Sequence, residues 1–154
     1  MNNIVQSDRE RLNILLTTSK EYESQAEQIQ IQIDYLNQSI AATQIEGETI
    51  ESLKNLQNGQ EILLPLGNLT FIKAKLLDSS KVLINVGASV VLEKSIDHAK
   101  EQLDQHLENL SKSQMQLRQA LQQIMQEIQK IRSEVEKLAV KMQQPQKQKL
   151  AMGS

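Results

Sequence analysis

The sequence has very few aromatic residues, no cysteine and almost no proline. Aromatic residues make up 2% of the 154 residues, and tryptophan is absent. A compact globular core is therefore not expected. Without cysteine the chain forms no disulfide. Only Pro65 and Pro145 interrupt a sequence rich in Gln, Glu, Lys, Leu and Ile, and this composition favours long helices.

The chain also lacks a strong charge of either sign and any long apolar run. Its formal net charge is −2, and acidic and basic residues are interspersed, so we expect no nucleic-acid partner and no binding to a membrane surface. No apolar run approaches the roughly 20 residues that span a bilayer, and the N-terminal residues contain no apolar signal-peptide core. These features together favour a cytoplasmic location.

Two long stretches carry the alternating three- and four-residue spacing of apolar side chains that is typical of coiled coils. Most positions of the first seam are apolar, and they are Val5, Asp8, Leu12, Leu15, Ser19, Tyr22, Ala26, Ile29, Ile33, Leu36, Ile40, Thr43, Gly47 and Ile50. The second seam is Ile96, Lys100, Leu103, Leu107, Leu110, Gln114, Leu117, Leu121, Ile124, Ile128, Ile131, Val135, Leu138 and Met142. Asn58 and Gly59 are typical helix-ending residues, and the second helix is predicted to end before Pro145.

Two helices of similar length in one chain can fold back on each other as an antiparallel hairpin. Residues whose numbers add up to about 150 then face each other, which pairs Ile40 with Leu110 and Ile33 with Leu117. Apolar seam positions meet apolar seam positions in this register, and residues 1–12 come to lie beside residues 138–154. The competing arrangement is a parallel homodimer, which requires a sharp break at the centre of the chain.

Residues 58–94 interrupt the helical pattern with four strand-like runs: EILLPL (61–66), LTFIKAKLL (69–77), KVLINV (81–86) and SVVLE (89–93). Turn residues separate the runs, so two consecutive β-hairpins are predicted. A two-residue Gly87-Ala88 turn pairs Ile84 with Val91, whereas a longer turn shifts that register.

Isolated hairpins are marginally stable in water, so we expect these strands to pair with strands of other subunits. The alternative is a self-sufficient miniature sheet. The residues predicted to form the oligomerisation face are Ile62, Leu64, Ile72, Ala74, Leu76, Val82, Ile84, Val86, Val90 and Leu92.

The segments EILLPLGNLTFIKAK and KVLINVGASVVLEK, followed by SIDHAKEQL, resemble the α class of the prefoldin family, both archaeal α subunits and eukaryotic subunit 5-like chains. The Leu-Pro-Leu of the first strand and the Val-x-Leu-Glu-Lys before the second helix carry the likeness. Two hairpins rather than one favour the α class over the β class. The resemblance implies an ATP-independent holdase: a hexamer of two α and four β subunits that captures unfolded proteins between coil tips and passes them to a group II chaperonin.

The expected fold class is α+β, a long antiparallel two-helix coiled coil with two β-hairpins at its base that join an oligomeric β-barrel. The expected division is an N-terminal coiled-coil helix (1–57), a double β-hairpin oligomerisation segment (58–94), a C-terminal coiled-coil helix (95–144) and a flexible tail (145–154). Coiled coil is expected over most of the chain, and the hairpins mark the site of assembly.

Apolar residues near the ends of the two helices are the candidates for client binding. Ile14 and Leu16 lie off the seam, so the coil does not cover them, and methionine adapts to varied partners. A frayed terminus with incidental apolar residues explains the same pattern equally well. The predicted client-binding tip residues are Ile4, Val5, Ile14, Leu16, Val140, Met142, Leu150 and Met152.

No combination of residues predicts an enzyme, a metal site or a cofactor. His98 and His106 lie about 12 Å apart along a helix, which is too far for one metal, and neither Gly67 nor Gly87 belongs to a phosphate-binding loop. The alternative to a chaperone is a coiled-coil scaffold or adaptor that uses its coil faces for one specific partner. An RNA-holding accessory arm would need a basic face, which this sequence lacks.

Overall fold

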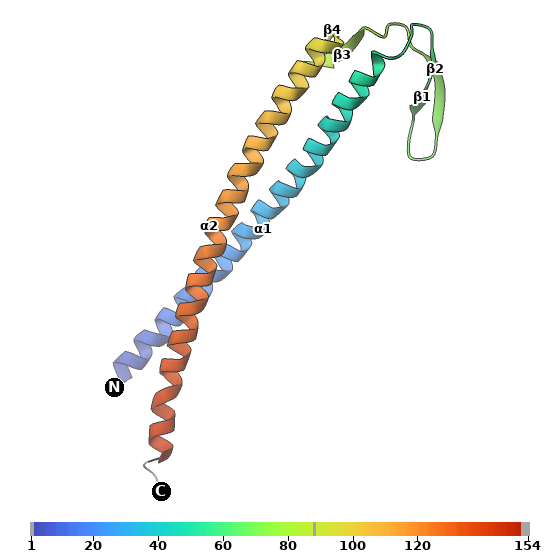
Figure 1. The fold of residues 1–154 in the computed structure, drawn as a ribbon. Coiled ribbons are helices and arrows are strands. Elements are labelled where there is room, and N and C mark those ends of the chain that lie inside the picture. Colours follow the sequence, from blue (N-terminus) through green and yellow to red (C-terminus); the bar gives the residue numbers. More distant parts are fainter. Residues whose placement is uncertain (1, 88, 152–154) are drawn as a thin grey trace. The chain divides into compact units, whose positions relative to one another are not determined.

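The computed structural model describes the backbone of residues 2–87 and 89–151, and the side chains of residues 6–87 and 89–143. The element order is α1 (Asn2–Leu53), β1 (Glu61–Pro65), β2 (Phe71–Lys75), β3 (Lys81–Asn85), β4 (Val91–Ser95) and α2 (Ile96–Ala151) (Figure 1). The predicted α+β fold is confirmed: two long coiled-coil helices are separated in the sequence by two β-hairpins.

The chain forms two compact units, the first made of Met1–Tyr35 with Gln114–Ser154 and the second of Leu36–Ser113. In the first unit α1 and α2 pair in antiparallel directions, as three ion pairs show: Lys141–Asp8 at 2.9 Å, Arg11–Glu134 at 3.2 Å and Arg132–Glu23 at 3.0 Å. In the second unit the bridging pairs are Lys100–Glu51 at 2.9 Å and Lys54–Asp97 at 2.8 Å. The residue numbers in each pair add up to about 150, so the predicted register is confirmed.

Both predicted seams are covered within the chain. Every seam position from Asp8 to Ile50 and from Ile96 to Met142 is buried or half-buried, whereas most other helix positions are exposed. Ile33 and Ile128 are each 3% exposed in the first unit, and Ala99 is fully buried in the second. The core is therefore a thin stripe between the two helices, as expected for a coiled coil with few aromatic residues.

The C-terminal ends of α1 and α2 differ from the prediction. α1 ends at Leu53 rather than at residue 57, and the backbone amides of Lys54, Asn55 and Leu56 bond to carbonyls three residues earlier, which tightens the chain into turns. Gly59, which was predicted to end the helix, instead lies six residues beyond Leu53; it adopts a φ of 83°, and its amide bonds to the Leu76 carbonyl. α2 continues through Pro145 to Ala151, beyond the predicted end at residue 144. An interior proline removes one backbone hydrogen bond and its ring crowds the carbonyl four residues earlier, so α2 continues past Pro145 at a cost in helix stability.

The strands form two separate two-stranded antiparallel sheets, β1–β2 and β3–β4. The link between them is held by Asn58, whose Oδ1 accepts a bond from the Ser79 amide at 2.8 Å, and by Asp78, which accepts bonds from the Ser80 amide and hydroxyl. These bonds from Ser80 hold the pKa of Asp78 below its ordinary value. β4 passes into α2 without a loop, and Ser95 ends the strand.

Candidate functional site

One face of each hairpin gathers the residues predicted to mediate assembly. In β1–β2 the register places Ile62 opposite Ala74 and Leu64 opposite Ile72. Cross-strand partners lie on the same face of a sheet, and residues two apart along a strand share that face. We call the set Ile62, Leu64, Ile72, Ala74 and Leu76 the first apolar face.

The second hairpin repeats this arrangement with a register that the sequence left open. Ile84 pairs with Leu92, not with Val91, because the Val86 amide bonds to the Val90 carbonyl at 2.9 Å and closes a turn longer than two residues. Gly87 and Ser89 both have positive φ, 105° and 61°. The second apolar face is Val82, Ile84, Val86, Val90 and Leu92. All ten predicted residues thus lie on these two faces, five on each hairpin.

The opposite faces of the hairpins also carry large exposed apolar side chains, which the sequence analysis did not select. Leu63 and Phe71 lie on this side of β1–β2, and Leu83, at 72% exposure, lies on this side of β3–β4. The sequence of β3, KVLIN, already indicated apolar side chains on both faces, because it has three consecutive apolar residues instead of alternating apolar and polar ones. Such runs are typical of strands that are covered on both faces.

Ion pairs also lie on the hairpins. Lys73 contacts Glu61 at 3.0 Å on the first, and Lys81 contacts Glu93 at 2.7 Å on the second. Glu93 raises the pKa of Lys81 above its ordinary value, chiefly through this hydrogen bond. Both pairs are exposed, so each adds little stability to the free chain.

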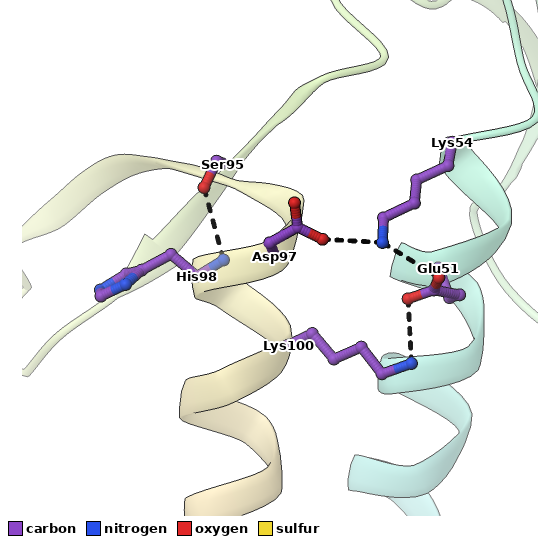
Figure 2. A network of polar contacts seen from close by, with 6 residues as sticks. All are labelled: Glu51, Lys54, Ser95, Asp97, His98 and Lys100. Atoms are coloured by element: carbon purple, nitrogen blue, oxygen red, sulfur yellow. Dashed lines mark hydrogen bonds and ion pairs between the residues drawn. The ribbon is translucent and has the colours of Figure 1, made fainter.

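A chain of charges joins the end of α1 to the start of α2 (Figure 2). Glu51 accepts bonds from Lys100 at 2.9 Å and from Lys54 at 3.0 Å, and Lys54 also contacts Asp97 at 2.8 Å. Lys100 and then Lys54 hold the pKa of Glu51 below its ordinary value, while Asp97 and then Glu51 raise the pKa of Lys54. Ser95 accepts a bond from the His98 amide at 3.4 Å, which caps the start of α2. The network ties the two helices together beside the hairpins.

Three of the predicted tip residues are exposed in the first unit. Ile14, Leu16 and Val140 are 66%, 44% and 56% exposed, whereas Met142 lies on the seam and is half-buried. The Asp8–Lys141 ion pair places the start of α1 beside the later part of α2, as predicted. The other predicted tip residues, Ile4, Val5, Leu150 and Met152, lie outside the described side chains.

A shallow groove of about 350 Å³ runs beside Leu16. Its apolar lining comes from Leu16, Ile131 and Val135, and charged side chains, including the Arg132–Glu23 pair, border it. This groove gives Leu16 apolar neighbours on α2. The arrangement suits contact with an apolar side chain of another molecule rather than chemistry at a reacting bond.

Within residues 6–87 and 89–143 no group of three or more His, Cys, Asp or Glu side chains is placed to hold a metal ion. Over the described part of the chain, neither helix has the length and hydropathy needed to cross a membrane.

Comparison with known proteins identifies a family. The model of the prefoldin subunit family matches residues 22–148. Prefoldin subunit alpha 1 of Thermococcus kodakarensis is 30% identical over 100 residues, covering 65% of this chain and 68% of the relative. Prefoldin subunit alpha of Pyrococcus horikoshii is 36% identical over 92 residues, covering 56% and 62%, and that of Methanopyrus kandleri is 37% identical over 57 residues, covering 37% and 36%. The matches thus span between 36% and 68% of these relatives' own lengths.

A solved structure has the same fold. A chain in the cryo-EM structure of filamentous PFD from Methanocaldococcus jannaschii superposes with a TM-score of 0.67 at 24% identity, covering 77% of this chain and 98% of that one. The family match covers most of the chain and includes both hairpins, and the named relatives are α subunits. The chain therefore belongs to the prefoldin family, as an α-class subunit.

Proposed function

We propose that this chain is one subunit of an ATP-independent holdase that assembles through its hairpins and captures unfolded proteins near the ends of its helices. The partners are β-class prefoldin subunits, in a hexamer of two α and four β chains, and captured clients pass to a group II chaperonin in the cytoplasm. Family membership and the exposed apolar residues on the hairpins and near the tip support this proposal.

The observation that carries the client-binding part is the exposure of Ile14, Leu16 and Val140 beside a seam that is otherwise covered. Each of these residues is at least 44% exposed, so part of its apolar surface is available for contact with another molecule. Scattered apolar side chains on a polar helix surface bind other apolar groups weakly and without a fixed sequence requirement. This is the behaviour needed for a protein that holds many different unfolded chains.

Weak contacts become useful when several subunits present them together. Each additional contact with one client is intramolecular, so the combined affinity exceeds that of any single tip while each contact still dissociates readily. Assembly through the apolar faces of the hairpins supplies this multivalency. Release then needs no nucleotide, because a chaperonin with higher affinity can compete for the client one contact at a time.

The test is aggregation of a denatured client protein, followed by light scattering without ATP, in the presence of this chain assembled with candidate β-class subunits. The tip variant carries Ile14→Ser, Leu16→Ser and Val140→Ser. The matched control carries serine at three exposed apolar positions elsewhere on the helices, Ile31, Ile45 and Met125. We expect the tip variant to assemble normally and to lose at least half of the protection, while the control keeps it.

Two further arms complete the design. Deletion of residues 1–12 and 140–154 tests the predicted tip residues that lie outside the described side chains. Binding of the client-loaded complex to a group II chaperonin tests the transfer of the client. Equal protection by the tip variant and the wild type would refute the tip assignment. Failure of every complex to protect any client would refute the holdase.

A coiled-coil scaffold is the second candidate, and the outward side chains of α1 favour it. Ile31 and Tyr35 lie one helical turn apart and are both well exposed. A specific partner would use such a face. Stoichiometric binding of one protein that survives the tip substitutions and is lost on Ile31→Ser would favour this function over the holdase.

A further inference from the structure

Lys94 is the one charged residue on the apolar side of β3–β4 among the described residues. The register pairs it with Val82, and it follows Leu92 by two positions along β4, so it lies on the same face as the second apolar face. The first apolar face contains no charged residue. The two apolar faces thus differ in charge, since only the second hairpin has a cation on this side, next to α2.

The charge of Lys94 has no partner within the described part of the chain. The other lysine of this hairpin, Lys81, lies on the opposite face and contacts Glu93 at 2.7 Å. The Lys94 side chain is partly buried, although no described carboxylate lies within ion-pairing distance. Covering this face with another subunit removes more water from the ammonium group, and a buried ammonium is strongly unfavourable unless a counter-charge meets it.

A second copy of this chain cannot supply that counter-charge from either apolar face. Packed in parallel, two β3–β4 faces bring Lys94 toward Lys94; packed in the opposite direction, they bring it toward Val86 and Val90. The first apolar face offers only uncharged side chains. Like charges and an unpaired cation both disfavour the complex.

We propose that Lys94 determines which partner the β3–β4 hairpin accepts: it disfavours a second copy of this chain and selects a different subunit that places an aspartate or glutamate against the second apolar face. The inference rests on the proposed function to the extent that the apolar faces mediate assembly. It adds the chemistry by which a partner is chosen. The β1–β2 hairpin, whose apolar face is uncharged, exerts no such selection.

The experiment measures self-association of this chain alone, by analytical ultracentrifugation and native mass spectrometry. Lys94→Leu removes the charge and is expected to strengthen self-association about tenfold or more, the factor that corresponds to about 1.4 kcal/mol. Lys94→Glu alone is expected to resemble the wild type. An equimolar mixture of Lys94→Glu with the wild type is expected to form the larger species, since each face now meets the opposite charge.

Lys75 provides the matched control. It is a lysine on the opposite side of β1–β2, so Lys75→Leu adds the same apolar side chain away from both apolar faces. It is expected to raise self-association much less than Lys94→Leu does, because it removes no charge from an apolar face. Circular dichroism verifies helix content for each variant, and Lys94→Gln, neutral but polar, replaces the leucine variant if that one precipitates.

The proposal is overturned if removal of the charge and the mixture of opposite charges both leave the mass distribution of the wild type unchanged, or if Lys75→Leu has the same effect as Lys94→Leu. The readout is assembly mass, not client protection. A chain that protects clients but shows no effect at Lys94 would therefore retain the holdase and lose only the partner selection.

Discussion

The helices and the hairpins of this chain differ in how far their apolar residues are exposed. Along α1 and α2 the seam positions are buried or half-buried, and the exposed apolar residues are scattered. On the hairpins, large apolar side chains remain exposed on both sides of each two-stranded sheet. Helices can cover an apolar stripe by pairing within one chain, whereas a two-stranded sheet is too small to cover its own faces. The strands are therefore the part of the molecule that we expect to depend on other chains.

Truncating one apolar residue in each region gives the largest expected contrast. Ile33→Ala removes a side chain that is 3% exposed, and we expect it to lower the free energy of unfolding by about 2–5 kcal/mol. Leu92→Ala, at 42% exposure, should lower it by less than about 1 kcal/mol in the free chain. Urea unfolding followed by circular dichroism measures both.

The control for this comparison is Ile31→Ala, two residues from Ile33 and 63% exposed, which should change stability by about 0.5 kcal/mol or less. A loss at Leu92 as large as that at Ile33 would contradict the contrast. It would mean that the hairpins form the self-sufficient miniature sheet considered from the sequence.

Substitution of two glycines compares the backbone of a helix with that of the loop before the hairpins. Gly47 occupies a seam position in α1, and an added Cβ would meet no atom within 4 Å, so Gly47→Ala should stabilise the chain by about 0.5–1 kcal/mol through helix propensity. Gly59, between α1 and β1, has a φ of 83°, so Gly59→Ala should destabilise it by about 1 kcal/mol. Thermal unfolding of the two variants should move in opposite directions, and movement in the same direction would refute this account.

The charges beside the hairpins should give the smallest effect. Because Lys100 and Lys54 lower the pKa of Glu51, its ionised form stabilises the folded state at neutral pH, and this contribution disappears as the pH falls below the ordinary glutamate value of about 4.3. Glu51→Gln should therefore lower the Tm slightly at pH 7 and by less at pH 3. Glu48→Gln, at a nearby exposed position with no ion pair among the described residues, is the control. An equal difference at both pH values would show that the ion pairs do not contribute.

The sequence predicted the helices better than their ends. A heptad repeat is a local signal that recurs many times, so occasional polar members such as Asp8 or Thr43 did not obscure it. The exit of α1 and the passage of α2 through Pro145 depend on a few hydrogen bonds, and such boundaries leave a weak trace in the sequence.

For the hairpins too, the sequence predicted the general pattern better than the local details. Their apolar faces followed from alternation, but the register of the second depended on Ser89, a residue other than glycine with positive φ, which composition does not reveal. The last strand was predicted to end at Glu93 and extends to Ser95, so Lys94 was left out of the face on which it lies. The tip and assembly roles remain predictions, since they concern molecules other than this chain.

The direct passage of β4 into α2 constrains how this chain can change in length. Ser95 ends the strand and caps the helix, and the Ile96 amide bonds to the Ser80 carbonyl at 3.2 Å, so no residue is free between the two elements. One inserted residue would turn the whole of α2 by about 100° relative to β4, so its seam would no longer face the same way relative to the hairpin. Insertions and deletions in this family are therefore expected to accumulate on the other side of the hairpins, in the looped stretch between Leu53 and Glu61, while the strand-to-helix junction keeps a constant length.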